Sequence, residues 1–183
     1  MFTIGSIREP CSYHVSYWAS QSVFNRSEKA DKLSGMHYGK DEHYASKADI
    51  ERFRLYIEET GSKGIDPVLK MANRQDMFPG GILTRRFLTS YTKKNHNFST
   101  DDVDCWVRTE RLKDDLDICL QRFMNQGGII PYYNDFIDSF SKDIHKNPSD
   151  HMPCAYYFDH STAKLVQESE AFIYKTFNMV GCC

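Results

Sequence analysis

Two side chains near the start of the chain, Arg8 and Ser16, have the chemistry and the spacing to bind an anion. A guanidinium offers charged N–H donors to a phosphate, and a hydroxyl adds one more hydrogen bond. They are eight residues apart. If Arg8 ends a strand and Ser16 lies about two turns into the following helix, both groups can reach one phosphate.

The sequence around Arg8 predicts these two elements. Residues 2–7 (FTIGSI) are apolar and uncharged, which is typical of a strand buried on both faces of a parallel sheet. Pro10 suits the first turn of a helix, and residues 12–20 continue with aromatic and small residues at helical spacing. We therefore expect Arg8 at the strand's carboxyl end, facing a helix N-terminus, where open α/β sheets bind anions. The alternative is an ordinary strand-loop-helix in which Arg8 pairs with a local carboxylate.

This pattern resembles the 3′-phosphate-binding element of sulfotransferases that use 3′-phosphoadenosine-5′-phosphosulfate (PAPS). In that family a strand ends in Arg, commonly followed by an acidic residue and Pro, with a Ser eight residues after the Arg and an aromatic beside it. Arg8-Glu9-Pro10 and Ser16-Tyr17 match this element. The resemblance implies that Arg8 and Ser16 bind the 3′-phosphate of PAPS, and that the cofactor needs no metal here.

Later segments resemble the same family in the correct order. Residues 104–110 read as a second short strand and 111–125 as an amphipathic helix, so we expect this strand beside the first one. Residues 82–88, a predicted short helix, resemble a Thr-Arg-aromatic-Leu segment of Golgi-type carbohydrate sulfotransferases. The remaining matches are Glu110, Leu112, Asp115, Asn147, Ser149, Tyr157, Asp159, Val166, Glu170, Ile173, Tyr174 and Phe177.

The expected fold class is α/β, in a single domain over residues 1–183. Alternating strands and helices predict a short parallel sheet flanked by helices, and the resemblance implies a three-layer fold like that of P-loop NTPases. The resemblance covers only the second part of the family's domain, because the loop for the 5′-phosphosulfate is missing. We therefore expect an N-terminally truncated chain: a fragment, a truncated gene product, or a derived form that lost or replaced this loop.

Two groups of residues are candidates for binding the acceptor. Residues 25–47 form a predicted long polar loop, in which His37 and His43 could take a proton from a hydroxyl, or could simply be solvated. Arg85 and Arg86, with the nearby Lys93 and Lys94, form a positive patch. Arginine suits carboxylate and sulfate, although an exposed basic helix face is the alternative.

Three further elements follow from local patterns. Residues 47–60 predict a helix stopped by Gly61, and residues 135–145 predict another helix. Residues 155–159 read as an extended aromatic piece, after which Ser161 caps a final helix.

Composition limits the partners of the chain. The formal net charge of −2 and a pI near 6.4 do not indicate a general nucleic-acid or membrane-surface binder. The sequence has no apolar run of about eighteen residues, so no membrane-spanning segment is expected. Six cysteines show neither CxxC pairs nor zinc-site spacing, and most of them read as core thiols, with Cys105 and Cys119 packing as small hydrophobes.

Two functions remain open. The first is a sulfotransferase that moves a sulfuryl group from PAPS to a carbohydrate hydroxyl, with the missing half or a partner chain supplying the chemistry; no catalytic residue is identified. The second is a non-catalytic α/β module that binds a partner or an anion. A kinase-type nucleotide-binding protein is disfavoured because no Walker loop is present. A fragment of a carbohydrate enzyme implies the Golgi lumen, whereas a complete chain implies the cytoplasm.

Overall fold

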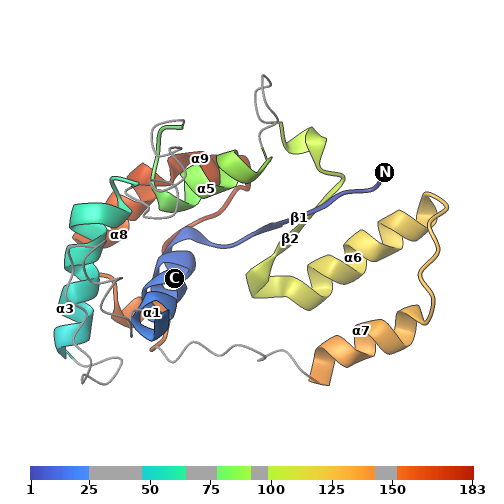
Figure 1. The fold of residues 1–183 in the computed structure, drawn as a ribbon, viewed down its shortest axis with the longest axis horizontal. Coiled ribbons are helices and arrows are strands. Elements are labelled where there is room, and N and C mark those ends of the chain that lie inside the picture. Colours follow the sequence, from blue (N-terminus) through green and yellow to red (C-terminus); the bar gives the residue numbers. More distant parts are fainter. Residues whose placement is uncertain (25–46, 65–77, 92–98, 143–151) are drawn as a thin grey trace. The chain divides into compact units, whose positions relative to one another are not determined.

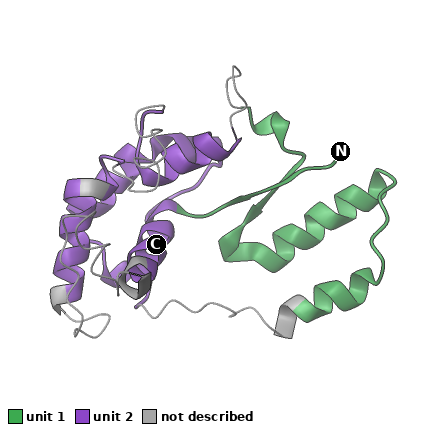
Figure 2. Ribbon diagram, viewed as in Figure 1, with its two compact units in different colours: residues 1–9, 97–148 green, residues 10–96, 149–183 purple. Residues whose placement is uncertain are grey.

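The computed structural model describes residues 1–24, 47–64, 78–91, 99–142 and 152–183. Within these residues the chain is mixed α/β and mostly helical, with a short parallel sheet of two strands (Figure 1). The chain divides into two compact units, each described by itself below (Figure 2). Unit 1 comprises residues 1–9 and 97–148, and unit 2 comprises residues 10–96 and 149–183. The expectation of a single domain stays a prediction.

Unit 1 contains the sheet. Strand β1 (Ile4–Ile7) pairs in parallel with β2 (Cys105–Arg108), so the predicted second strand lies beside the first. Helix α6 (Leu112–Asn125) follows β2 and packs against it, as the pattern predicted. Helix α7 (Tyr133–Lys142) packs on α6, where the Tyr133 hydroxyl donates a hydrogen bond to Asp117. Two short 3₁₀ turns complete the unit, at Thr100–Asp102 and Thr109–Arg111.

The prediction that the first strand is buried on both faces is wrong. Gly5 and Ile7 are buried, whereas Ile4 is 39% exposed and Ser6 is exposed. The reason is that α6 packs mainly against β2 and leaves these β1 side chains uncovered. The buried face is tightly filled, because a Cβ on Gly5 would lie 2.4 Å from the Trp106 ring.

Unit 2 is helical in the part of the chain that the structure describes. Its helices are α1 (Pro10–Phe24), α3 (Lys47–Tyr56) with a π-helical turn at Ile57–Gly61, α5 (Ile82–Tyr91), α8 (His160–Ser169) and α9 (Ala171–Thr176). A core of aromatic and aliphatic side chains joins them: Cys11, Val15, Trp18, Phe53, Tyr56, Ile57, Ile82, Tyr157 and Val166. Among the described helices of the whole chain, none is long and apolar enough to cross a membrane.

The end of the chain differs from the prediction in three ways. The expected extended piece is a 3₁₀ turn, Cys154–Tyr156. The cap of the next helix is Asp159 rather than Ser161, because the Asp159 carboxylate accepts the Thr162 N–H at 2.9 Å in a reciprocal capping box. The predicted final helix is divided at Glu170 into α8 and α9.

Asp159 should make the stability of unit 2 sensitive to acid. The Thr162 main-chain N–H lowers the pKa of Asp159 to about 2 from an ordinary 3.8. A depressed folded-state pKa means that this stabilisation is full above about pH 5 and is lost as the pH falls toward 2. We expect Asp159→Asn to be less stable than wild type at pH 7 and the gap to close by about pH 2. Urea unfolding at several pH values measures this, and a gap independent of pH would contradict it.

The prediction that most cysteines are core thiols is wrong, because all six form disulfides. The pairs are Cys11–Cys182, Cys105–Cys119 and Cys154–Cys183. Packing of α6 on β2 brings the Cα atoms of Cys105 and Cys119 within 5.6 Å, inside the usual range for a disulfide. The adjacent Cys182 and Cys183 tie the last residues of the chain to two separate segments of unit 2.

Candidate functional site

Arg8 comes directly after the last residue of β1, as the sequence predicted. Its Nε lies 3.9 Å from Oε1 of Glu110, and the same oxygen accepts the Glu9 N–H at 2.9 Å. The local carboxylate of the alternative interpretation is therefore present. At 3.9 Å the contact is an ion pair without a hydrogen bond, and the Arg8 side chain is 33% exposed.

A second arginine ends β2 at the same edge of the sheet, since Ile7 is in register with Arg108. Asp115 holds Arg108 through two side-chain hydrogen bonds of 2.7 and 3.0 Å, and accepts its main-chain N–H at 3.0 Å. The hydrogen bond from the Arg108 side chain holds the pKa of Asp115 below its ordinary value. Arg108 is thus bound by a carboxylate in bidentate geometry, whereas the ion pair between Arg8 and Glu110 is longer, at 3.9 Å.

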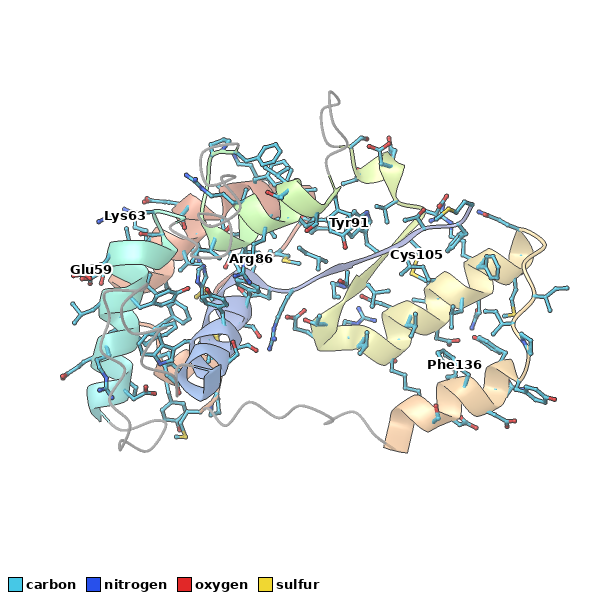
Figure 3. The ribbon with its side chains drawn as sticks, in the orientation of Figure 1. Glu59, Lys63, Arg86, Tyr91, Cys105 and Phe136 are labelled. Carbon is cyan, nitrogen blue, oxygen red and sulfur yellow. A yellow bond between two sulfur atoms is a disulfide. The ribbon has the colours of Figure 1, made fainter. Side chains whose placement is uncertain are left out.

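Ser16 lies on α1 in unit 2 and is half-buried. The guanidinium of Arg86 lies over the ring of the neighbouring residue Tyr17, with the Arg86 Cζ 4.7 Å from the ring centroid. The side chain of Arg86 is labelled in Figure 3. A cation over an aromatic face is attracted by the ring quadrupole. Arg8 belongs to unit 1, so Arg8 and Ser16 are each placed within their own unit.

The predicted positive patch consists of residues with different surroundings. Arg85 donates from Nε to the carbonyl oxygen of Gly80 at 2.8 Å and so holds the turn before α5. Arg86 instead lies over the ring of Tyr17. Of the other predicted residues, Lys93, Lys94, His37 and His43 lie outside the described residues, as does most of the predicted loop at 25–47.

A buried carboxylate that the sequence analysis did not single out as a site residue, Glu170, organises unit 2. Its Oε1 accepts the Leu83 N–H at 3.0 Å, and its Oε2 accepts the Thr84 N–H at 2.7 Å and the Thr84 hydroxyl at 2.6 Å. These two amides are the second and third of α5, so Glu170 caps that helix from another part of the chain. Gly81 permits the approach, because a Cβ there would lie 2.2 Å from Glu170 Oε1.

His14 extends the network of Glu170 to α1 and α3. Its Nε2 lies 3.2 Å from Glu170 Oε1 and its Nδ1 lies 3.0 Å from the Tyr56 hydroxyl. His14 and Glu170 are both fully buried. A neutral imidazole with its proton on Nε2 satisfies both contacts, since it donates to Glu170 and accepts from Tyr56. The network therefore joins α1, α3, α5 and the α8–α9 junction without an unpartnered nitrogen on His14.

The described cysteines do not offer an available metal site. The sulfur atoms of Cys11, Cys182 and Cys183 lie within 4.8 Å of one another. Each is bonded in a disulfide, and metals are ligated by thiolates. This cluster would need reduction before it could hold a cation.

Comparison of the chain with protein-family models, curated proteins and solved structures finds no match. A function for the chain must therefore be argued from its own residues.

Proposed function

We propose that the chain carries the 3′-phosphate-binding part of a PAPS-dependent sulfotransferase that modifies a carbohydrate hydroxyl. The observation that supports this most is the placement of Arg8: a parallel strand ends immediately before it, and α1 begins two residues later at Pro10. Strand ends that lead into helix N-termini are anion sites in open α/β folds. The fold proposed for the whole enzyme is the three-layer arrangement of P-loop NTPases.

In this proposal Arg8 and Ser16 bind the same phosphate. The guanidinium donates two N–H groups to phosphate oxygens, and the serine hydroxyl donates one more hydrogen bond. A phosphate with up to two negative charges competes favourably with Glu110, whose single carboxylate approaches Arg8 at 3.9 Å. Glu110 then serves to orient Arg8 when the site is empty.

The reaction transfers SO₃ from PAPS to the acceptor. The bond between sulfur and the bridging oxygen of the 5′-phosphate breaks, a bond from the acceptor oxygen to sulfur forms, and the acceptor proton passes to a base. Positive charge must stabilise the leaving phosphate oxygen. The base and that charge are proposed to come from the part of the enzyme that holds the 5′-phosphosulfate.

The disulfides support a location in an oxidising compartment. All six cysteines are paired, and disulfides persist in secreted and lumenal proteins but are rare in the cytosol. This agrees with the Golgi lumen, where carbohydrate sulfotransferases of the resembling type act.

A second function, a non-catalytic anion- or partner-binding module, is favoured by one observation. Arg8 already has a carboxylate beside it, which is what an ordinary structural arginine requires. In that case Arg8 stabilises the end of the sheet through its ion pair with Glu110, and the chain has no binding site for PAPS.

Arg8→Ala tests the proposed function. We expect binding of 3′-phosphoadenosine-5′-phosphate to weaken at least about tenfold, because a charge-assisted bond to phosphate is worth on the order of 2 kcal/mol. The matched control is Arg122→Ala, which removes an exposed arginine of the same unit. Calorimetric titration of both variants measures the affinities, and equal affinity in Arg8→Ala and wild type would sink the assignment.

A further inference from the structure

Two disulfides of unit 2 meet in one cluster of sulfur atoms. Cys11–Cys182 and Cys154–Cys183 share the final segment of the chain, in which Cys182 and Cys183 are adjacent. The sulfur atoms of Cys11, Cys182 and Cys183 all lie within 4.8 Å of one another, although Cys183 is bonded to neither of the other two. One sulfur of the second disulfide is therefore close to both sulfurs of the first.

The four cysteines of this cluster differ in burial. Cys11 on α1 is fully buried, and its sulfur lies 3.5 Å from the Tyr174 hydroxyl. Cys154 and Cys182 are partly buried and pack against the core of unit 2. Cys183 is exposed. A thiol from solution therefore reaches the Cys154–Cys183 disulfide first, and Cys11 is the buried partner that stays in place.

The segment that carries Cys182 and Cys183 has little packing just before these residues. Val180 is 92% exposed, and a Cβ on Gly181 would have no atom within 4 Å among the described residues outside its chain neighbours. To exchange partners, the segment must shift by about one residue, which is about 3.8 Å between Cα atoms. Packing around Val180 and Gly181 does not oppose such a shift.

We propose that Cys182 and Cys183 exchange disulfide partners when a thiol opens the exposed disulfide. The thiolate of the added thiol attacks Cys154 Sγ, forms a mixed disulfide and releases the Cys183 thiolate. The Cys183 thiolate attacks Cys11 Sγ, forms a Cys11–Cys183 disulfide and releases the Cys182 thiolate. Cys182 then attacks the mixed disulfide at Cys154, which forms Cys154–Cys182 and returns the thiolate that was added.

This sequence of exchanges consumes no oxidant or reductant. Attack of Cys183 on Cys182 is disfavoured, because disulfide-bonded Cα atoms are usually about 4.4–6.8 Å apart and those of adjacent residues only about 3.8 Å. In either pairing the final segment stays linked to Cys11 on α1 and to Cys154, so opening one disulfide does not release it. The exchange is independent of nucleotide binding.

The first arm of the test isolates the central step. Cys154→Ala leaves the Cys183 thiol next to the intact Cys11–Cys182 disulfide. After incubation at about pH 8, where a cysteine is partly thiolate, we expect N-ethylmaleimide to label Cys182 as well as Cys183. The ratio of the two labels should lie within about tenfold of one, or about 1.4 kcal/mol, because both pairings join the same chemical groups. Mass spectrometry with fragmentation between the two residues locates the label.

The matched control is Cys119→Ala, which leaves one thiol at Cys105 in unit 1. We expect its label on Cys105 alone, at a protein concentration low enough to suppress exchange between chains. Label on Cys183 alone in Cys154→Ala would overturn the proposal. Equal spreading of the label in the control would also overturn it, because exchange would then not depend on the sulfur cluster.

The second arm uses the wild-type chain, so it does not depend on the folding of a variant. Incubation with reduced glutathione should produce Cys11–Cys183 and Cys154–Cys182 links beside the original ones, with no link to the cysteines of unit 1. Mapping of the disulfide-linked peptides by mass spectrometry measures this. Finding only the original links, with or without glutathione bound at Cys154, would contradict the exchange.

Discussion

Glu170→Ala should lower the free energy of unfolding of the chain by about 3–5 kcal/mol, because it leaves buried hydrogen-bond donors without an acceptor and opens a cavity. The variant leaves the Leu83 and Thr84 amides and the Thr84 hydroxyl without their acceptor, and leaves a cavity beside His14. Each orphaned buried donor costs about 1–3 kcal/mol, although these costs are not fully additive. Unit 2 is therefore expected to depend strongly on Glu170.

Urea unfolding followed by circular dichroism measures this loss. The matched control is Glu168→Ala, which removes an exposed glutamate two residues earlier on α8. It forms a 3.8 Å ion pair with Lys164, and its side chain is 62% exposed. Surface changes of this kind cost about 0.5 kcal/mol or less. Equal losses in the two variants would mean that the Glu170 network does not carry the stability assigned to it.

Removing the Cys11–Cys182 disulfide should cost more than removing Cys105–Cys119. In the chain-entropy account a cross-link stabilises by restricting the unfolded chain, and the effect grows with the length of the closed loop. The two cysteines are separated by 171 residues in the first disulfide and by 14 in the second. The expected losses are about 5 and about 3 kcal/mol.

The measurement compares Cys11→Ala/Cys182→Ala with Cys105→Ala/Cys119→Ala by urea unfolding under non-reducing conditions. The ordering is the informative result, because both double variants remove the same chemical groups. A larger loss for the short loop would show that local packing, rather than restriction of the unfolded chain, decides the contribution of each disulfide.

Elements with a strong local pattern were predictable from sequence. The apolar run at 2–7 gave β1, and the amphipathic repeat before Gly127 gave α6. The pairing of the two strands also followed, because strand, helix and strand in succession favour a parallel sheet. These features depend on residues that lie close together in the chain. Local patterns in a single sequence predict such features best.

Features that depend on distant residues were missed. Glu170 caps a helix 86 residues away, and nothing in the sequence near Glu170 or Thr84 indicates that they meet. The cysteines show neither CxxC pairs nor zinc-site spacing, so the disulfides become evident only from the packing of α6 on β2 and from the course of the final residues. The prediction that Ser161 caps the final helix was wrong because Asp159 is an equally good capping residue, and local pattern does not distinguish the two.

The candidate site was predictable in part. The end of β1 fixed the position of Arg8, because a charged residue ends an apolar strand. Arg85 and Arg86 are adjacent residues of the same type, so the sequence does not predict different roles for them. Their surroundings in the fold differ: the Arg85 guanidinium donates a hydrogen bond to the Gly80 carbonyl, and the Arg86 guanidinium lies over the ring of Tyr17.

The central claim is tested most directly by calorimetric titration of the wild-type chain with 3′-phosphoadenosine-5′-phosphate, with adenosine 5′-monophosphate as the control ligand. The account predicts roughly micromolar binding, worth about 8 kcal/mol, that requires the 3′-phosphate. Failure of a demonstrably folded chain to bind either nucleotide, or equal binding of both, would contradict the proposed phosphate site at Arg8 and Ser16.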